Sequence, residues 1–180
     1  TKGDSIKDPQ GQSNGIIHKA LEILEKLEHR GAVSSDGKTG DGAGILIDIP
    51  YDFFKENCDF DLPEARAYAM GNVFLPQKEN QRAYCKKIFE EQIEAKGLKL
   101  LGWRRVPVDT GYLGAIAASV EPHIEQIFIG KPNDEMQEQE FMIKLYSARK
   151  ITEHTILNSK LSERTYFYLP SLSNKTLIFK

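Results

Sequence analysis

Three segments of the chain carry apolar residues at every third or fourth position, which is the spacing of one face of an α-helix. The first opens at Ser13-Asn14-Gly15 and ends at Arg30, directly before Gly31. The second runs from Glu79 to Lys96, and the third runs from Glu135 to Leu157. The pattern therefore predicts three amphipathic helices. In the second helix, the predicted apolar face consists of Tyr84, Ile88, Phe89 and Ile93.

Short runs of β-branched and aromatic residues, bounded by glycine, proline or serine, predict strands between these helices. The runs are Ile45–Ile49, Ala69–Leu75, Leu98–Val108, Ile124–Ile129, Thr165–Leu169 and Thr176–Phe179. The last two lie close together, and Ser171, Ser173 and Asn174 between them predict a hairpin. Residues 51–55 predict one helical turn, and residues 111–120 fit a helix and an extended segment equally well. This interleaved order favours one mixed α/β or α+β layered domain.

Composition narrows the classes of function. The chain has 180 residues, of which 40% are hydrophobic and 28% charged, and a formal net charge of −2. No block of like charge indicates binding to nucleic acid or to a membrane surface. No apolar run is long enough to cross a bilayer, and the N-terminus has no apolar leader. Two cysteines without metal-ligand spacing favour a reducing cytoplasm over a disulfide framework.

The most informative segment is a glycine-rich loop between the first predicted helix and the first predicted strand. Arg30 and Gly31 end the helix, and Asp41 lies between Gly40 and Gly42 just before the strand. Glycines allow positive φ and a close approach of the backbone to another group. A phosphate-binding loop is disfavoured, because such loops follow a strand and precede a helix. Spacing alone leaves two interpretations open, a tight connection and the wall of a binding site.

Other candidate residues are weaker. The four histidines are scattered, and no pair has the spacing of metal ligands on a predicted helix face. Cys58 and Cys85 lie near predicted amphipathic helical elements, so we expect packing rather than nucleophilic chemistry for both. Alternation along a strand places Arg104 on the face opposite Trp103, and Arg149 and Lys150 are predicted to lie on a solvated face. These residues give no complete catalytic set and name no substrate.

Several segments, in order along almost the whole chain, resemble the N-terminal region of glutamate synthase large subunits. The first matches are Leu24–Ala32, with His29-Arg30-Gly31 inside it, and Thr39–Leu46, with Gly40-Asp41-Gly42-Ala43-Gly44. Later matches are Gly71–Gln77, Leu101–Val108, Gln126–Gly130, Tyr166–Ser173 and Thr176–Lys180. Each segment alone is weak, but their shared order is specific.

The resemblance implies a class II glutamine amidotransferase domain with the N-terminal-nucleophile hydrolase fold. That fold is an α+β, four-layer αββα sandwich, in which two β-sheets pack face to face between helical layers. In the family, a cysteine at the mature N-terminus attacks the side-chain amide of glutamine, and its own α-amino group, of pKa about 8, accepts the thiol proton. The ammonia released is used at a flavin domain to convert 2-oxoglutarate to glutamate.

Carried onto this sequence, the resemblance implies that Arg30 orients the nucleophilic end and that Gly31, Asp41 and Gly42 form the substrate-binding wall beside it. The sequence departs from the family's pattern because position 1 is Thr1 rather than cysteine. The family's Cys-Gly-x-Gly-Phe strand, second arginine segment and Asn-Gly oxyanion donors are also not found in it. We therefore expect residues 1–180 to be a single partial amidotransferase domain that is incomplete at both ends and inactive alone.

The resemblance also implies cofactors and partners outside this chain. The full-length enzyme of the family uses FMN and an iron–sulfur cluster, and we expect neither cofactor nor any metal to be held by this chain. Expected partners are glutamine, the remaining domains of the same polypeptide and a small electron-transfer subunit. Two alternatives stay open, namely a non-catalytic amidotransferase-like module for binding or regulation, and an unrelated α/β nucleotide-binding domain.

Overall fold

The computed structural model describes residues 14–26, 44–111 and 113–179. The chain divides into two compact units, which are residues 1–43 with 112–118 and residues 44–111 with 119–180. In the first unit, the described elements are α1 (Asn14–Lys26) and most of the short helix α4 (Ala115–Ser119). The predicted first helix is thus confirmed as far as Lys26. The other elements belong to the second unit.

The centre of the second unit is a three-stranded antiparallel sheet with the order β2-β4-β3. Its strands are β2 (Tyr68–Leu75), β3 (Lys99–Arg105) and β4 (His123–Gly130). β4 is the middle strand and pairs along its full length with β2. Between Leu100 and Gly102, β3 contains a bulge, so one extra residue stands opposite β4. The predicted runs Ala69–Leu75 and Ile124–Ile129 lie inside β2 and β4, while the predicted run Leu98–Val108 is longer than β3 at both ends.

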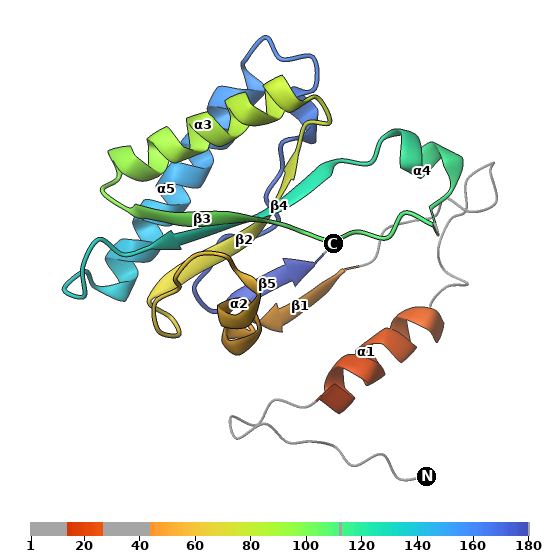
Figure 1. Ribbon diagram of the computed structural model, residues 1–180, viewed down its shortest axis with the longest axis horizontal. Helices are drawn as coiled ribbons and strands as arrows, with labels where there is room; N and C mark the ends of the chain where they lie inside the picture. Colours follow the sequence, from red (N-terminus) through yellow and green to blue (C-terminus); the bar gives the residue numbers. More distant parts are fainter. Residues whose placement is uncertain (1–13, 27–43, 112, 180) are drawn as a thin grey trace. The chain divides into compact units, whose positions relative to one another are not determined.

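One face of this sheet is covered by two long helices, α3 (Glu79–Ala95) and α5 (Glu138–Leu157) (Figure 1). Alternate residues of β2 and β4 enter a core cluster there, because successive side chains of a strand point to opposite faces. The buried members of this cluster on the two strands are Ala69, Val73, Leu75, Ile127 and Ile129. α3 contributes Phe89 and Ile93, and α5 contributes Phe141 and Leu145. Both helices were predicted from their period.

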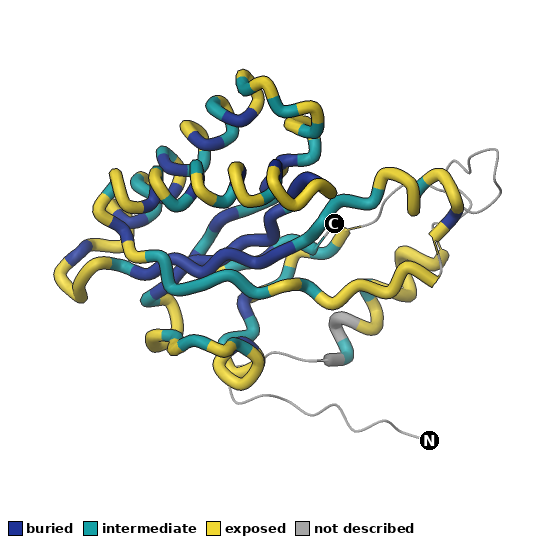
Figure 2. The backbone as a smooth tube through the Cα atoms, turned by 45° about the horizontal axis from the view of Figure 1, so that its top comes forward, coloured by how far each residue is buried: buried dark blue, intermediate teal, exposed yellow. Residues whose placement is uncertain are grey.

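The opposite face of the sheet packs against α2 (Tyr51–Asn57) and against a two-stranded antiparallel sheet of β1 (Ile45–Asp48) and β5 (Thr176–Phe179). The buried side chains of this second cluster are Ile49, Phe54, Tyr68, Met70, Phe128 and Leu177. Figure 2 shows that the central strands are buried along most of their length, while much of the outer surface of the helices is exposed. The fold of the second unit is therefore mixed α+β with two small antiparallel sheets.

The predicted hairpin of Thr165–Leu169 with Thr176–Phe179 is wrong. β5 pairs with β1, from near the other end of the chain, and residues 164–166 form a 3-10 helix. The segment that follows lies along the free edge of β2, with bridges from Tyr168 to Phe74 and from Ser173 to Met70. The sequence correctly indicated a turn but not that both flanking segments pair with other strands.

Smaller differences also have physical reasons. The predicted strand to Val108 ends at Arg105 as β3, near Pro107, which has no N–H for pairing. Tyr84 was predicted to lie on the apolar face of α3, but it is 39% exposed. The neighbouring Cys85 is fully buried on that face instead. Residues 115–119 are helical, which decides the ambiguous segment. None of the helices in the described part of the chain is long and apolar enough to cross a membrane.

Candidate functional site

The residues that sequence analysis singled out as a site, Arg30, Gly31, Asp41 and Gly42, lie outside the described residues. The structure describes the chain again from Gly44, which directly precedes β1. The site is therefore built from the elements that hold β1, because this strand continues the glycine-rich loop.

β1 is fixed on one side by β5. Their antiparallel register runs from Ile45 opposite Phe179 to Asp48 opposite Thr176. The pairing continues past the end of β1, where the Ile49 amide donates to the Lys175 carbonyl over 2.9 Å. Backbone pairing together with burial of Ile49 in the second cluster holds the strand that leads out of the glycine-rich loop.

A polar row crosses the three-stranded sheet and reaches β5. Asn72, Gln126 and Arg104 are partners across adjacent strands in the register of the sheet. The Gln126 amide donates to Asn72 Oδ1 over 3.0 Å, and Arg104 Nη1 donates to Gln126 Oε1 over 2.9 Å. At the other end of the row, Asn72 Nδ2 donates to the carbonyl of Ile178 on β5 over 2.7 Å. The row thus ties β5, the partner of β1, to the central sheet.

Burial makes this polar row energetically important. Asn72 is 4% exposed and Gln126 is 2% exposed. Polar side chains this deeply buried destabilise a fold unless they are hydrogen-bonded. Both amides are hydrogen-bonded, to one another and to Arg104 or the Ile178 carbonyl. Sequence analysis did not identify the row. A signal was present at Asn72, which interrupts an otherwise apolar run in β2.

The Arg104 end of the row packs against α2. Its guanidinium carbon lies 5.5 Å from the ring centre of Phe53 and 5.9 Å from that of Phe54, and its Nε donates to the Asn57 carbonyl over 3.2 Å. On the other face of β3, the Trp103 indole donates to Glu90 of α3 over 2.8 Å. The prediction that Arg104 and Trp103 point to opposite faces is therefore confirmed.

Neither cysteine has the environment of an activated nucleophile. Cys85 is fully buried in the first core cluster, and burial raises the pKa of its thiol to about 11. Burial also raises the pKa of Cys58, although the nearby Arg104 guanidinium opposes that effect. The expected packing role holds for Cys85, while Cys58 is half-buried. The basic side chain near Cys58 is Arg104, which comes from a strand distant in sequence.

His123 is the one histidine whose described surroundings form a charged cluster. Its Nε2 lies 3.0 Å from Glu125 Oε1, and Lys86 Nζ lies 2.6 Å from Glu125 Oε2. Burial lowers the pKa of His123, and the positive charges of Arg82 and Arg105 lower it further against the opposing effect of Glu125. Among the described residues, no group of three or more His, Cys, Asp or Glu side chains could hold a metal ion.

Comparison with known proteins identifies what the chain is similar to. The model of the family "Glutamine amidotransferases class-II" matches residues 6–180. The NADPH glutamate synthase large chain of Bacillus subtilis is 41% identical over 170 residues, which are 94% of this chain and 11% of that protein. The NADH glutamate synthase of Saccharomyces cerevisiae is 41% identical over 181 residues, with 94% of this chain and 8% of that protein covered.

A plant relative extends the comparison. The chloroplastic ferredoxin-dependent glutamate synthase 2 of Arabidopsis thaliana is 34% identical over 171 residues, which are 92% of this chain and 10% of that protein. The chain thus spans between 8% and 11% of the length of these relatives. Because the family model covers nearly the whole sequence, the chain belongs to the class II glutamine amidotransferase family.

Proposed function

We propose that this chain is part of the glutaminase domain of a glutamate synthase. The domain hydrolyses the side-chain amide of glutamine to glutamate and ammonia, and the ammonia serves the reductive amination of 2-oxoglutarate. The observation that carries the proposal is the match of the class II amidotransferase model to residues 6–180, together with relatives that are all named glutamate synthases. The chain matches only 8% to 11% of the length of these relatives, so the reaction of the complete enzyme also needs regions outside this chain.

The proposal does not include the electron donor of the complete enzyme. The relatives named for NADPH, NADH and ferredoxin match this chain over 92% to 94% of its length. A region shared by enzymes with three different donors does not distinguish the donor. The chain also has only two cysteines, whereas an iron–sulfur cluster is generally held by four thiolates. We therefore assign neither the FMN nor the iron–sulfur cluster of the complete enzyme to this chain.

The proposed nucleophile is not one of the cysteines in the printed sequence. Family chemistry requires a cysteine with a free α-amino group as its base, and Cys58 and Cys85 are both internal. Their raised pKa values further reduce the thiolate fraction at neutral pH. We propose that the chain alone does not hydrolyse glutamine and that it contributes the binding wall rather than the attacking group.

Within that wall, we propose that Arg30 orients the nucleophilic end and that Gly31, Asp41 and Gly42 line the substrate. Support comes from the sequence motif and from β1, which begins directly after the loop and is held by β5 and the polar row. We further propose the αββα sandwich of the family as the fold of the complete domain. The second core cluster, which includes residues of both sheets, supports that arrangement, as does the α3–α5 layer.

A comparison of two activities tests the proposal. In the glutamate synthase that carries this chain, Arg30→Ala should reduce glutamine-dependent glutamate formation at least ten-fold while leaving ammonia-dependent formation nearly unchanged. Arg164→Ala, at an exposed arginine in the 3-10 helix, is the matched control and should alter neither activity. Equal loss of both activities in Arg30→Ala would assign Arg30 a structural role.

A second measurement tests the nucleophile. The chain alone should release no glutamate from glutamine above the uncatalysed rate, and Cys58→Ser and Cys85→Ser should make no difference. Glutamine hydrolysis that disappears in Cys58→Ser would overturn the proposal for the nucleophile. Glutamine binding without hydrolysis in the complete polypeptide would instead favour a non-catalytic binding module.

A further inference from the structure

We infer that the second unit contains a binding site for a small oxyanion, phosphate or carboxylate, at the edge of the central sheet where β3 ends and β4 begins. Its lining residues are not among those proposed for the glutaminase wall, and the inference does not rest on the proposed function. It rests on a pocket in which basic side chains from three elements converge.

The pocket has a volume of about 340 Å³, which suits a small ligand. Its walls come from the residues after β2, from α3, from the end of β3 and from the start of β4. The lining residues that can donate hydrogen bonds are Gln77, Arg82, Arg105, Thr110 and His123. Apolar lining comes from Val106, Val108, Pro122 and Ile124.

The two arginine side chains in the pocket differ in how many hydrogen bonds they make within the chain. Arg82 is held by the chain, since its Nη1 lies 3.4 Å from the Pro76 carbonyl oxygen and 3.2 Å from the Gln77 carbonyl oxygen. The remaining donors of its guanidinium are not used by these contacts. Arg105 is exposed, and its side chain makes no hydrogen bond or ion pair with any residue in the described part of the chain. One guanidinium that is held in place and one without a side-chain partner therefore line the same pocket, where both can donate to an oxyanion.

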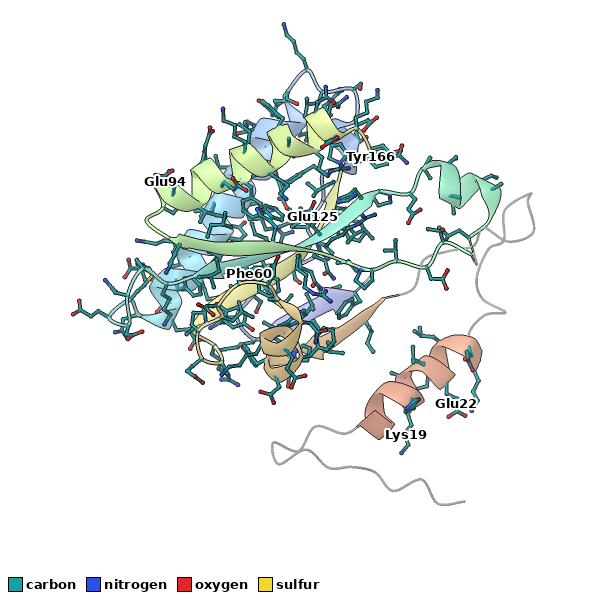
Figure 3. The ribbon with its side chains drawn as sticks, in the orientation of Figure 1. Lys19, Glu22, Phe60, Glu94, Glu125 and Tyr166 are labelled. Carbon is teal, nitrogen blue, oxygen red and sulfur yellow. The ribbon has the colours of Figure 1, made fainter. Side chains whose placement is uncertain are left out.

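The nearest buried carboxylate does not cancel this positive charge. Glu125, labelled in Figure 3, is 8% exposed and lies on β4, where Lys86 of α3 contacts it. One of its oxygens meets Lys86 over 2.6 Å and the other meets His123 Nε2 over 3.0 Å. Glu121 is the acidic residue in the lining itself, so the pocket has two permanent positive charges against one negative charge.

His123 lines the pocket, so its protonation should respond to a bound anion. With Nε2 directed at Glu125, the other ring nitrogen accepts a proton when the ring becomes charged. Arg82 and Arg105 disfavour that charge, while Glu125 favours it, and Lys86 already neutralises Glu125. A bound anion offsets the two guanidinium charges, so it should raise the pKa of His123, and an anion of fixed charge should bind more tightly when the ring is protonated.

The experiment is an NMR titration of the chain with inorganic phosphate, and separately with acetate, at constant ionic strength adjusted with chloride. The His123 ring and the Arg105 side-chain N–H signals should shift and saturate, and the His123 pKa should rise with phosphate present. The ring signals of His18 and His154, which do not line the pocket, serve as internal references and should not change on addition of either anion. Saturation by phosphate alone identifies a phosphate site, and saturation by both anions identifies a general oxyanion site.

Variants complete the test. Arg105→Gln should weaken binding at least ten-fold, and Arg105→Lys should restore part of the loss, because Arg105 is exposed and its replacement leaves the core intact. Lys87→Gln removes the same charge from an exposed position on α3 outside the pocket and should leave binding unchanged. Shifts that chloride reproduces, or that persist at full strength in Arg105→Gln, would overturn the inference.

Discussion

The side-chain amide of Gln126 on β4 donates to Oδ1 of Asn72 on β2 over 3.0 Å, and the two residues are direct partners in the antiparallel register. Both side chains are almost completely buried. The Asn72 amide also donates to the Ile178 carbonyl on β5. The position of β5 therefore depends on the register of β2 against β4. A slip of β2 against β4 by one residue would leave both amides without these partners.

We predict that Gln126→Met lowers the free energy of unfolding by about 1 to 3 kcal/mol. Methionine is similar in size, so the loss comes from the hydrogen bonds rather than from a cavity. The substitution leaves Asn72 Oδ1 without its donor, Gln126 Nε2, and Arg104 Nη1 without its acceptor, Gln126 Oε1. Urea unfolding followed by circular dichroism measures the change.

The control for this prediction is Gln139→Met. Gln139 is exposed on α5, so the same chemical change there should alter stability by less than about 0.5 kcal/mol. Equal effects of the two substitutions would mean that the polar row contributes nothing beyond an ordinary surface amide.

We predict that Gly71→Ala is strongly destabilising, by about 1 to 3 kcal/mol or more. A Cβ at position 71 would overlap the backbone carbonyl oxygen of Ser171, in the segment that lies along the edge of β2. Backbone atoms cannot rotate away as a flexible side chain can, so the segment must shift. Thermal unfolding of the variant, with Gly111→Ala as control, tests this. At Gly111 the added Cβ meets only a side-chain oxygen of Asp109, at 3.2 Å, and we expect little change.

How far the sequence predicts this fold depends on how local each determinant is. The helices α3 and α5 and the strand β2 were predicted because each has a strong period or a long apolar run. The pairing of β5 with β1 was not predicted, because turn residues such as Ser173 indicate a change of direction but not the partner strand. Partners that are distant in sequence leave no local signal.

The same reason explains the missed polar contacts. Arg149 was predicted to lie on a solvated face, yet its Nη2 donates to the Leu169 carbonyl, twenty residues further along the chain. The row of Asn72, Gln126 and Arg104 exists only because the register aligns three strands. The glycine-rich loop and Arg30 were found from sequence alone, and their roles stay predictions because they lie outside the described residues.

We predict that the two thiols react at very different rates with a thiol reagent. Cys58 is half-buried and should react slowly in the folded chain, faster as pH rises because its raised pKa keeps it protonated at neutral pH. Cys85 is fully buried and should react only after unfolding. Mass spectrometry of chain treated with iodoacetamide, with and without denaturant, measures both rates. In Cys58→Ser no labelling should occur before unfolding, and native-state labelling of Cys85 would contradict its place in the core.

A final prediction concerns Glu153 on α5, which receives Arg149 Nε and Lys150 Nζ, each at 2.7 Å. Burial opposes the charged form, but the hydrogen bonds from the two cations outweigh it and lower the pKa of Glu153. A lowered pKa in the folded state stabilises the fold above the ordinary glutamate pKa of about 4.3 and loses that contribution as pH falls through the folded value.

Glu153→Gln should therefore reduce stability at pH 7 by about 1 kcal/mol, the upper end for a partly exposed ion pair. The difference from the unsubstituted chain should shrink as pH falls below about 4, where the native carboxylate is protonated as well. Urea unfolding at a series of pH values measures it. Glu140→Gln is the control on the same helix, because its partner Lys144 lies 3.1 Å away and Glu140 is 53% exposed. That control should have a smaller effect at pH 7. A Glu153→Gln difference that stays constant down to low pH would mean that the loss comes from packing rather than from charge.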